Sequence, residues 1–133
     1  MLSMVITPKF GDVDGLRHIN NNVLPQWFEL ARNPIYRIFN PDYKFESWNL
    51  ILAHIDFDFL EQMYFDQDVE VRSGVSKIGN SSFVVYQEAW QGGRLCVKGK
   101  TVVVDFDFAN KKSVRIPDAE RARLMEHYIE LPE

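Results

Sequence analysis

Apolar residues after position 23 recur with the period of an amphipathic helix. They fall in alternating steps of four and three residues, at Leu24, Phe28, Ala31, Ile35 and Ile38. One of the asparagines at 20–22 is expected to cap this helix, and Pro25 suits its first turn, where an amide proton has no helical partner. Pro34 removes an internal hydrogen bond, so we expect the helix to kink or break near Asn33.

Beyond this helix the apolar period shortens to two, which is typical of strands with one buried face. In segment 53–59, apolar residues alternate with a histidine and two aspartates, so one face of the strand should be dry and the other wet. Three further strand-like runs follow, at 68–77, 82–91 and 94–108.

Turn residues connect these runs into an antiparallel meander. The pairs at 79–80 and 92–93 contain glycine and suit two-residue hairpin turns. A shorter helix is expected at 118–129, directly after Pro117. Together with one early strand, these elements predict an α+β domain in which an antiparallel sheet covers a long central helix.

The composition is that of an ordinary globular domain. The chain has 133 residues, 46% hydrophobic and 26% charged, so we expect a single domain over 1–133. A net charge of -4 gives no basic face for nucleic acid, and no apolar run is long enough to span a membrane. The single Cys96 cannot form an internal disulfide, and the first residues lack a secretion signal. A cytoplasmic location is therefore expected.

Segment 10–21 concentrates polar groups at the entrance to the predicted helix: two aspartates, one histidine and two adjacent asparagines. A solvated, well-capped turn would use the same residues. The alternative is a functional site, because free N–H groups at a helix start can stabilise the oxyanion formed when a carbonyl is attacked. A nearby carboxylate can deprotonate water or attack the carbonyl itself. A thioester suits this chemistry because its thiolate leaves readily.

Segment 12–21 reads DVDGLRHINN and resembles the DxDxxGHVNN signature of hotdog thioesterases of the 4-hydroxybenzoyl-CoA type, which are related to the acyl-carrier-protein thioesterases. The sequence WFELAR at 27–32 is similar to the FExAR helix of that family. The resemblance continues through AHIDF at 53–57 and VSKIGNSSF at 75–83, and it covers about 7–124. It implies a hotdog fold, in which a curved antiparallel sheet wraps a long helix, and a dimer with active sites at the subunit interface.

The resemblance assigns a role to each polar residue of the segment. It places the catalytic base or nucleophile at Asp14 and gives Asp12 a structural or capping role. His18 takes the family histidine position, where it orients Asp14, water or the substrate, or else satisfies backbone groups of the loop. Asn20 matches the first asparagine, which either hydrogen-bonds the Asp14 carboxylate or caps the helix.

Two positions depart from the family pattern. Arg17 stands where the family has glycine, the residue that most readily adopts a positive φ. Leu16 stands where the plant carrier-protein thioesterases have a functional asparagine. We therefore expect fewer polar groups at this site than in that branch.

Substrate-binding residues are expected at two places. The acyl pocket should lie between helix and sheet near the subunit boundary, and Trp27 is expected among the aromatic residues that line it. The alternative is that these aromatic residues belong to the hydrophobic core. Lys77, Ser81 and Ser82 belong to a hairpin that in similar proteins approaches the coenzyme A phosphates. We expect them to bind substrate, although strand lysines also serve as solvated charges.

No cofactor is expected. Glu29 and Glu61 are assigned to the solvated surface, with a role as second carboxylate as the alternative. Three histidines and one cysteine show no zinc-binding spacing, and the chain has neither a glycine-rich phosphate loop nor a nucleophile-elbow serine. Coenzyme A therefore enters the prediction only as part of the substrate, and no metal is expected.

The predicted function is hydrolysis of an acyl-CoA or acyl-carrier-protein thioester by a homodimer or homotetramer. One alternative is a hotdog hydratase or dehydratase, since these enzymes also pair a carboxylate with a histidine. The hydratases carry an Asn-Pro pair between those two residues, which segment 15–17 lacks. A second alternative is a hotdog domain that only binds acyl-CoA.

Overall fold

The computed structural model describes residues 1–132. Two α-helices and six strands form the frame, together with short 3-10 turns at Phe10–Asp12, Asn21–Val23 and Phe45–Ser47. In chain order the main elements are β1 (Leu2–Ile6), α1 (Leu24–Phe39), β2 (Leu50–Phe59), β3 (Val69–Ile78), β4 (Ser82–Gln91), β5 (Arg94–Asp107), β6 (Lys112–Ser113) and α2 (Asp118–Met125).

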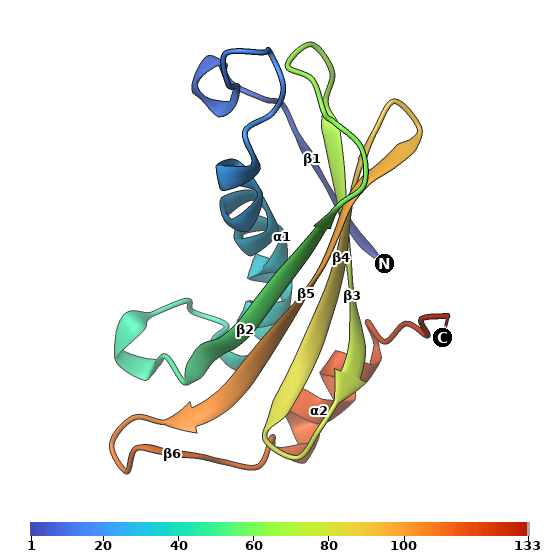
Figure 1. Cartoon of the computed structure of the whole chain (residues 1–133). Helices are drawn as coiled ribbons and strands as arrows, with labels where there is room; N and C mark the ends of the chain where they lie inside the picture. The colour runs from blue at the N-terminus through green and yellow to red at the C-terminus, as the bar shows by residue number, and fades with distance from the viewer. Residues whose placement is uncertain (133) are drawn as a thin grey trace.

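One curved antiparallel sheet wraps the long helix. Its strand order is β1-β3-β4-β5-β2, and the short β6 pairs with the end of β5. Figure 1 shows α1 lying along one face of this sheet, with β2 at an open edge and α2 near the turn between β3 and β4. The predicted α+β architecture, a central helix covered by an antiparallel sheet with a short C-terminal helix, is confirmed.

The helix α1 begins as the sequence indicates but does not break. Asn20 caps the 3-10 turn that leads into it, and Pro25 lies in its first turn. Of the kink or break expected near Asn33, the break is wrong, because α1 runs through Pro34 without a gap. Pro34 and Leu30 both lie on the exposed side of the helix. The Leu30 carbonyl, which loses its helical donor, can therefore be hydrated.

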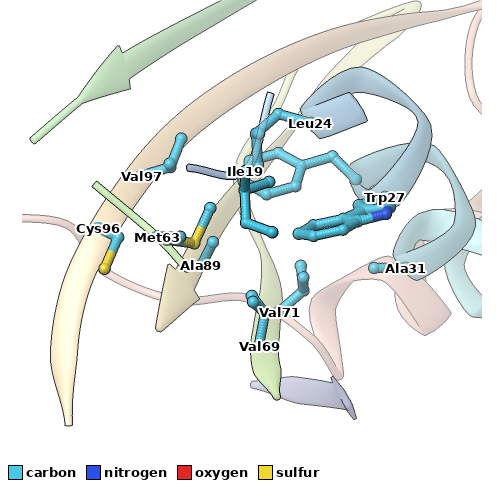
Figure 2. Close-up of a cluster of buried hydrophobic side chains, with 11 residues drawn as sticks. Ile19, Leu24, Trp27, Ala31, Met63, Val69, Val71, Ala89, Cys96 and Val97 are labelled. Carbon is cyan, nitrogen blue, oxygen red and sulfur yellow. The ribbon is translucent and has the colours of Figure 1, made fainter. Parts of the chain in front are cut away.

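The helix divides the core into two apolar clusters. The first packs the N-terminal half of α1 against β3, β4 and β5, and Figure 2 shows the Trp27 indole pointing into it, among Ile19, Leu24, Met63, Val69, Val71 and Val97. The second packs the C-terminal half of α1, including Ile35, against the other end of the sheet and Leu124 of α2. Burial of these apolar side chains supplies the main driving force for the fold.

A buried cation lies on α1 between the two clusters. Arg32 is 1% exposed. Its guanidinium donates to Tyr36 Oη at 2.9 Å, and to Gln87 Oε1 and Thr101 Oγ1 at 3.1 Å each. Gln87 Nε2 in turn donates to the Phe28 carbonyl at 2.9 Å. Because buried charge is costly without such partners, this network fixes the position of α1 on β4 and β5.

The strand β2 differs most from its prediction. A register shift between Leu52 and His54 interrupts its pairing with β5. On the helix side, Phe57 packs on Phe28 with ring centroids 5.2 Å apart, as the alternating pattern predicts. The rest of the strand after Leu50 is exposed or half-buried on both faces. The expected dry face is therefore only partly covered, because α1 lies over β3 and β1 rather than over the β2 edge.

Two boundaries also shift. The β4–β5 hairpin has the predicted two-residue turn, in which Gly92 and Gly93 both take positive φ. The β3–β4 connection contains one residue more than predicted, and Gly79 N–H donates to the Ser82 carbonyl across it. The last helix ends at Met125 instead of extending to 129. No helix within residues 1–132 is long and apolar enough to cross a membrane.

Candidate active site

Asp14 lies in a tight loop before α1, at one end of the sheet. Its Oδ1 accepts the backbone N–H of Leu16 at 2.8 Å and that of His18 at 3.2 Å. The Asp14 N–H donates to the His18 carbonyl at 2.9 Å, which closes the loop. Among the described residues, Oδ2 has no hydrogen-bond donor, and the side chain is exposed. One carboxylate oxygen is thus held in place while the other is free to act.

The loop keeps a left-handed residue although the family glycine is absent. Arg17 has a φ of 66°, and its N–H donates to the Asp14 carbonyl at 3.2 Å. A side chain in this region costs about 1–2 kcal/mol, which glycine would not incur. The turn therefore does not require glycine, and the Leu16 and His18 amides still point at the Asp14 carboxylate.

His18 contacts an aromatic ring rather than the carboxylate. Its imidazole lies edge-on to Tyr64, with ring centroids 5.3 Å apart and planes at 75°. The backbones of the two residues also form an isolated antiparallel bridge. His18 lines the same cavity as Asp14. The structure therefore brings the two side chains to one site without a hydrogen bond between them.

Asn20 and Asp12 shape the loop. Asn20 Oδ1 accepts the N–H of Asn22 at 3.0 Å, so its carboxamide serves as a helix cap and makes no bond to Asp14. Asp12 is 4% exposed; its Oδ2 accepts the N–H of Lys9 at 2.9 Å, and its carbonyl accepts the N–H of Asn20 at 2.8 Å. Of the two aspartates, only Asp14 presents its carboxylate to solvent.

A cavity of about 630 Å³ opens beside Asp14. Its walls come from the loop, the start of α1, the end of β2 and β5, with Asp14, His18, Asn20, Asn21, Leu24, Phe59, Leu60, Glu61, Gln62, Met63 and Val97 as lining residues. Glu61 brings a second carboxylate and pairs with Arg94, Nη1 to Oε2 3.3 Å. The backbone N–H of Asn21 has no acceptor within the described part of the chain, which leaves a donor at the start of the helix.

None of the other predicted substrate residues lines this cavity. Trp27 is 6% exposed and packs in the first apolar cluster (Figure 2). Lys77, Ser81 and Ser82 lie at the β3–β4 turn, which Figure 1 shows at the opposite end of the sheet from the loop with Asp14. Within one chain, therefore, the structure does not bring the hairpin and the carboxylate together.

A second and larger cavity was not predicted. It measures about 750 Å³ and lies between α1, the loop after α1 and the start of β2. The run YKFESW at 43–48 supplies several of its residues. Three of these six residues are aromatic, which was the signal in the sequence, but their spacing gives no reason to expect them to face α1. No group of three or more histidine, cysteine or acidic residues within 1–132 is placed to hold a metal ion.

Comparison with known proteins gives a consistent family. Residues 8–124 match the model of the Thioesterase-like superfamily. A predicted thioesterase from Bacillus stearothermophilus is 40% identical, with 98% of each chain covered and a TM-score of 0.95. A thioesterase from Thermus thermophilus, complexed with coenzyme A and Zn, is 26% identical, with 92% of this chain and 95% of that chain covered and a TM-score of 0.82.

Solved structures with lower sequence identity to this chain share its fold. A 1,4-dihydroxy-2-naphthoyl-CoA thioesterase from Synechocystis is 15% identical, with 94% of this chain and 96% of that chain covered and a TM-score of 0.80. No curated protein matches the chain significantly. The family model spans both the loop that carries Asp14 and the sheet that wraps α1. The chain therefore belongs to the Thioesterase-like superfamily and has its hotdog fold.

Proposed function

We propose that this protein is a thioesterase that hydrolyses an acyl-CoA or acyl-carrier-protein thioester at Asp14. The observation that carries the proposal is the carboxylate itself. One oxygen is held by two backbone amides, the other has no donor among residues 1–132, and Asp14 lines a cavity at the start of a helix. The 40% identical relative described as a predicted thioesterase supports the same reaction.

In this mechanism Asp14 activates a water molecule against the thioester carbonyl, or attacks that carbonyl directly. The Leu16 and His18 amides hold Oδ1, so Oδ2 is the oxygen left to take the proton or to attack. With water as the nucleophile, a bond forms between the water oxygen and the acyl carbon, the carbon–sulfur bond breaks, and the proton taken up by Asp14 passes to the leaving thiolate. With Asp14 as the nucleophile, the thiolate leaves and takes a proton from water, and a second water molecule hydrolyses the mixed anhydride to free acid and Asp14. His18 lines the cavity and orients the water or the substrate, since its ring is fixed against Tyr64.

The oxyanion is assigned to the start of the helix. The N–H of Asn21 is unpaired within residues 1–132 and its residue lines the cavity. Backbone amides at a helix start carry partial positive charge, and they act most strongly on the charge that develops as the carbonyl is attacked. A donor of this kind typically contributes about 10²–10³ in rate.

We also propose that two copies join along β2. This strand is an open sheet edge, and apolar residues along it and just beyond it are exposed: Ile51 41%, Leu52 45%, Phe59 54% and Leu60 49%. Exposed edges of this kind are normally covered. The two cavities lie at opposite ends of β2. Antiparallel pairing of β2 between copies would therefore set the Asp14 cavity of one copy beside the larger cavity of the other.

Release of free thiol from a panel of aromatic, short-chain and long-chain acyl-CoA and acyl-carrier-protein thioesters tests this proposal. We expect turnover of at least one class well above spontaneous hydrolysis. Binding of every thioester class without thiol release would instead favour a non-catalytic acyl-CoA-binding domain. Reversible water addition to an enoyl thioester, with no thiol released, would favour a hydratase.

A further inference from the structure

The larger cavity differs in chemistry from the one beside Asp14. Its walls are mainly aromatic and aliphatic, and its lining residues are Glu29, Tyr36, Tyr43, Phe45, Glu46, Trp48, Leu50, Ile51, Leu52, Val103 and Phe108. Most of these residues belong to α1, the loop that follows it and the start of β2, and Figure 1 shows where these three segments meet. Five aromatic side chains line this cavity of about 750 Å³, which suits a compact group that packs against aromatic rings.

Three of these rings pack edge to face. The Trp48 ring lies 5.8 Å from that of Tyr36 at 83°, and 5.2 Å from that of Tyr43 at 79°. Both phenol oxygens are engaged elsewhere, since Tyr36 Oη accepts from Arg32 and Tyr43 Oη donates to Asn33. The two tyrosines therefore contribute their rings, rather than their hydroxyl groups, to the cavity wall.

The charged residues that line this cavity are both acidic. Glu29 and Glu46 are its two charged residues, and within 1–132 neither is in an ion pair with a lysine, arginine or histidine. The pKa of Tyr43 is raised above its ordinary value, first by burial and then by Tyr36 and Glu29, although Arg37 and Arg32 act in the opposite direction. Glu29 therefore lies close enough to act on Tyr43, although Arg37 has the larger and opposite effect there.

Two arginines contact the tyrosine rings of this cavity without lining it. The Arg37 guanidinium carbon lies 4.5 Å from the centre of the Tyr43 ring, and Arg32 is buried beneath Tyr36. The Arg37 contact is itself a cation–π interaction. Neither arginine lines the cavity. The lining residues thus combine aromatic rings with two carboxylates and include no cation, which is the chemistry that recognises ammonium groups.

We propose that this cavity binds a positively charged, compact acyl terminus, such as a trimethylammonium group, so that the protein prefers thioesters of cationic acyl groups over neutral or acidic ones. The preference rests on the proposed thioesterase function. The cation would lie against Tyr36, Tyr43 and Trp48, with Glu29 and Glu46 balancing its charge. A carboxylate-ended acyl group would be repelled by the same two glutamates.

Three thioesters with equal spacers test the preference: butanoyl-CoA whose chain ends in trimethylammonium, tert-butyl or carboxylate. The first two have the same shape and differ in charge. We expect kcat/KM for the trimethylammonium compound to exceed that for the tert-butyl compound by about tenfold, as a cation–π site with a carboxylate would give, and the carboxylate compound to be the poorest substrate. Equal or reversed preference would overturn the proposal.

Charge removal provides the matched control. Glu29→Gln should lower the trimethylammonium to tert-butyl ratio several-fold. Glu126→Gln, at the end of α2 and exposed, should leave that ratio unchanged. If both variants keep the wild-type ratio, Glu29 does not contribute and the assignment of this cavity is wrong.

A binding measurement separates this inference from the proposed function. Choline and its neutral isostere 3,3-dimethyl-1-butanol (dimethylbutanol) can each be titrated into the protein while the indole N–H signal of Trp48 is followed by NMR. The Trp48→Phe variant assigns that signal. We expect choline to shift the signal at lower concentration than dimethylbutanol, whether or not any thioester is hydrolysed. If choline binds but no thioester is hydrolysed, the proposed thioesterase function is wrong and the cation site stands. If the Trp48 signal responds to neither compound, or equally to both, the cation site is wrong.

Discussion

Asp14 is the residue on which the proposed reaction depends. Asp14→Asn keeps the size of the side chain and its bonds to the Leu16 and His18 amides but removes the negative charge. General-base catalysis is typically worth about 10²–10⁴ in rate, so turnover should fall at least about a hundredfold with the fold intact. Thiol release and circular dichroism on the same preparation check both expectations.

Asp12→Asn is the matched comparison for this variant. Asp12 is buried and holds the loop through the Lys9 N–H, so its loss should act on stability more than on turnover. Turnover should fall much less than in Asp14→Asn. Near wild-type hydrolysis by the Asp14 variant would contradict the mechanism, and equal losses at both positions would leave the catalytic role unassigned between them.

Arg17 tests the conformation of the same loop. It holds a positive φ that β-branched residues strongly disfavour. Arg17 already carries the cost of one side chain at positive φ, and the branched Cβ of valine adds to it, so Arg17→Val should lower the free energy of unfolding by about 1 kcal/mol. Arg17→Gly should be nearly neutral, because relief of strain is offset by greater freedom of the unfolded chain. Urea denaturation of both variants measures the difference. If Arg17→Gly lowered the free energy of unfolding more than Arg17→Val, the left-handed backbone at this position would not be the cause of the loss.

At the scale of elements, the contact between α1, β2 and β5 depends on Gly99. A Cβ at this position would lie 2.6 Å from the Asp56 carbonyl oxygen and 3.1 Å from the Phe57 ring. Gly99→Ala should therefore force β2 and β5 apart and cost about 1–3 kcal/mol of stability. Gly11→Ala is the control, since nothing lies within 4 Å of its Cβ position. Thermal unfolding of both variants is the measurement, and equal melting temperatures would contradict this packing.

For the molecule as a whole, the exposed β2 edge predicts a homo-oligomer whose smallest form is a dimer. Ala53→Lys places a charge on this edge and should shift the protein toward the monomer, because edge lysines oppose strand pairing. Val5→Lys, on the other open edge at β1, is the control and should leave the dimer intact. Sedimentation at micromolar concentration reports the outcome; a monomeric wild-type protein, or dissociation by Val5→Lys alone, would contradict the β2 interface.

Elements with strong local patterns were predictable from the sequence. The steps of four and three from Leu24 to Ile38 specify a helix with one apolar stripe, and glycine at 92–93 specifies a tight hairpin. The DVDGLRHINN segment indicated Asp14 as the candidate residue, and the hydrogen bonds of the Asp14 carboxylate are local, since they join residues at most four positions apart. Signals of this kind are contained in a short stretch of chain.

Features made by distant residues were decided only by the tertiary structure. Arg32 could be read as one position of a helix motif, but its partners Gln87 and Thr101 follow 55 and 69 residues later. The aromatic cavity unites Tyr36 of α1 with Trp48 of a loop and Leu50 of β2, and no period in the sequence specifies that meeting. Trp27 likewise has the character of a pocket residue and becomes a core residue because Val69 and Val71 of β3 pack against it. Periodicity determines which face of an element is apolar. Whether that face becomes core, cavity or open edge is decided when the element docks on the rest of the fold, because only then is apolar surface buried against the loss of chain entropy.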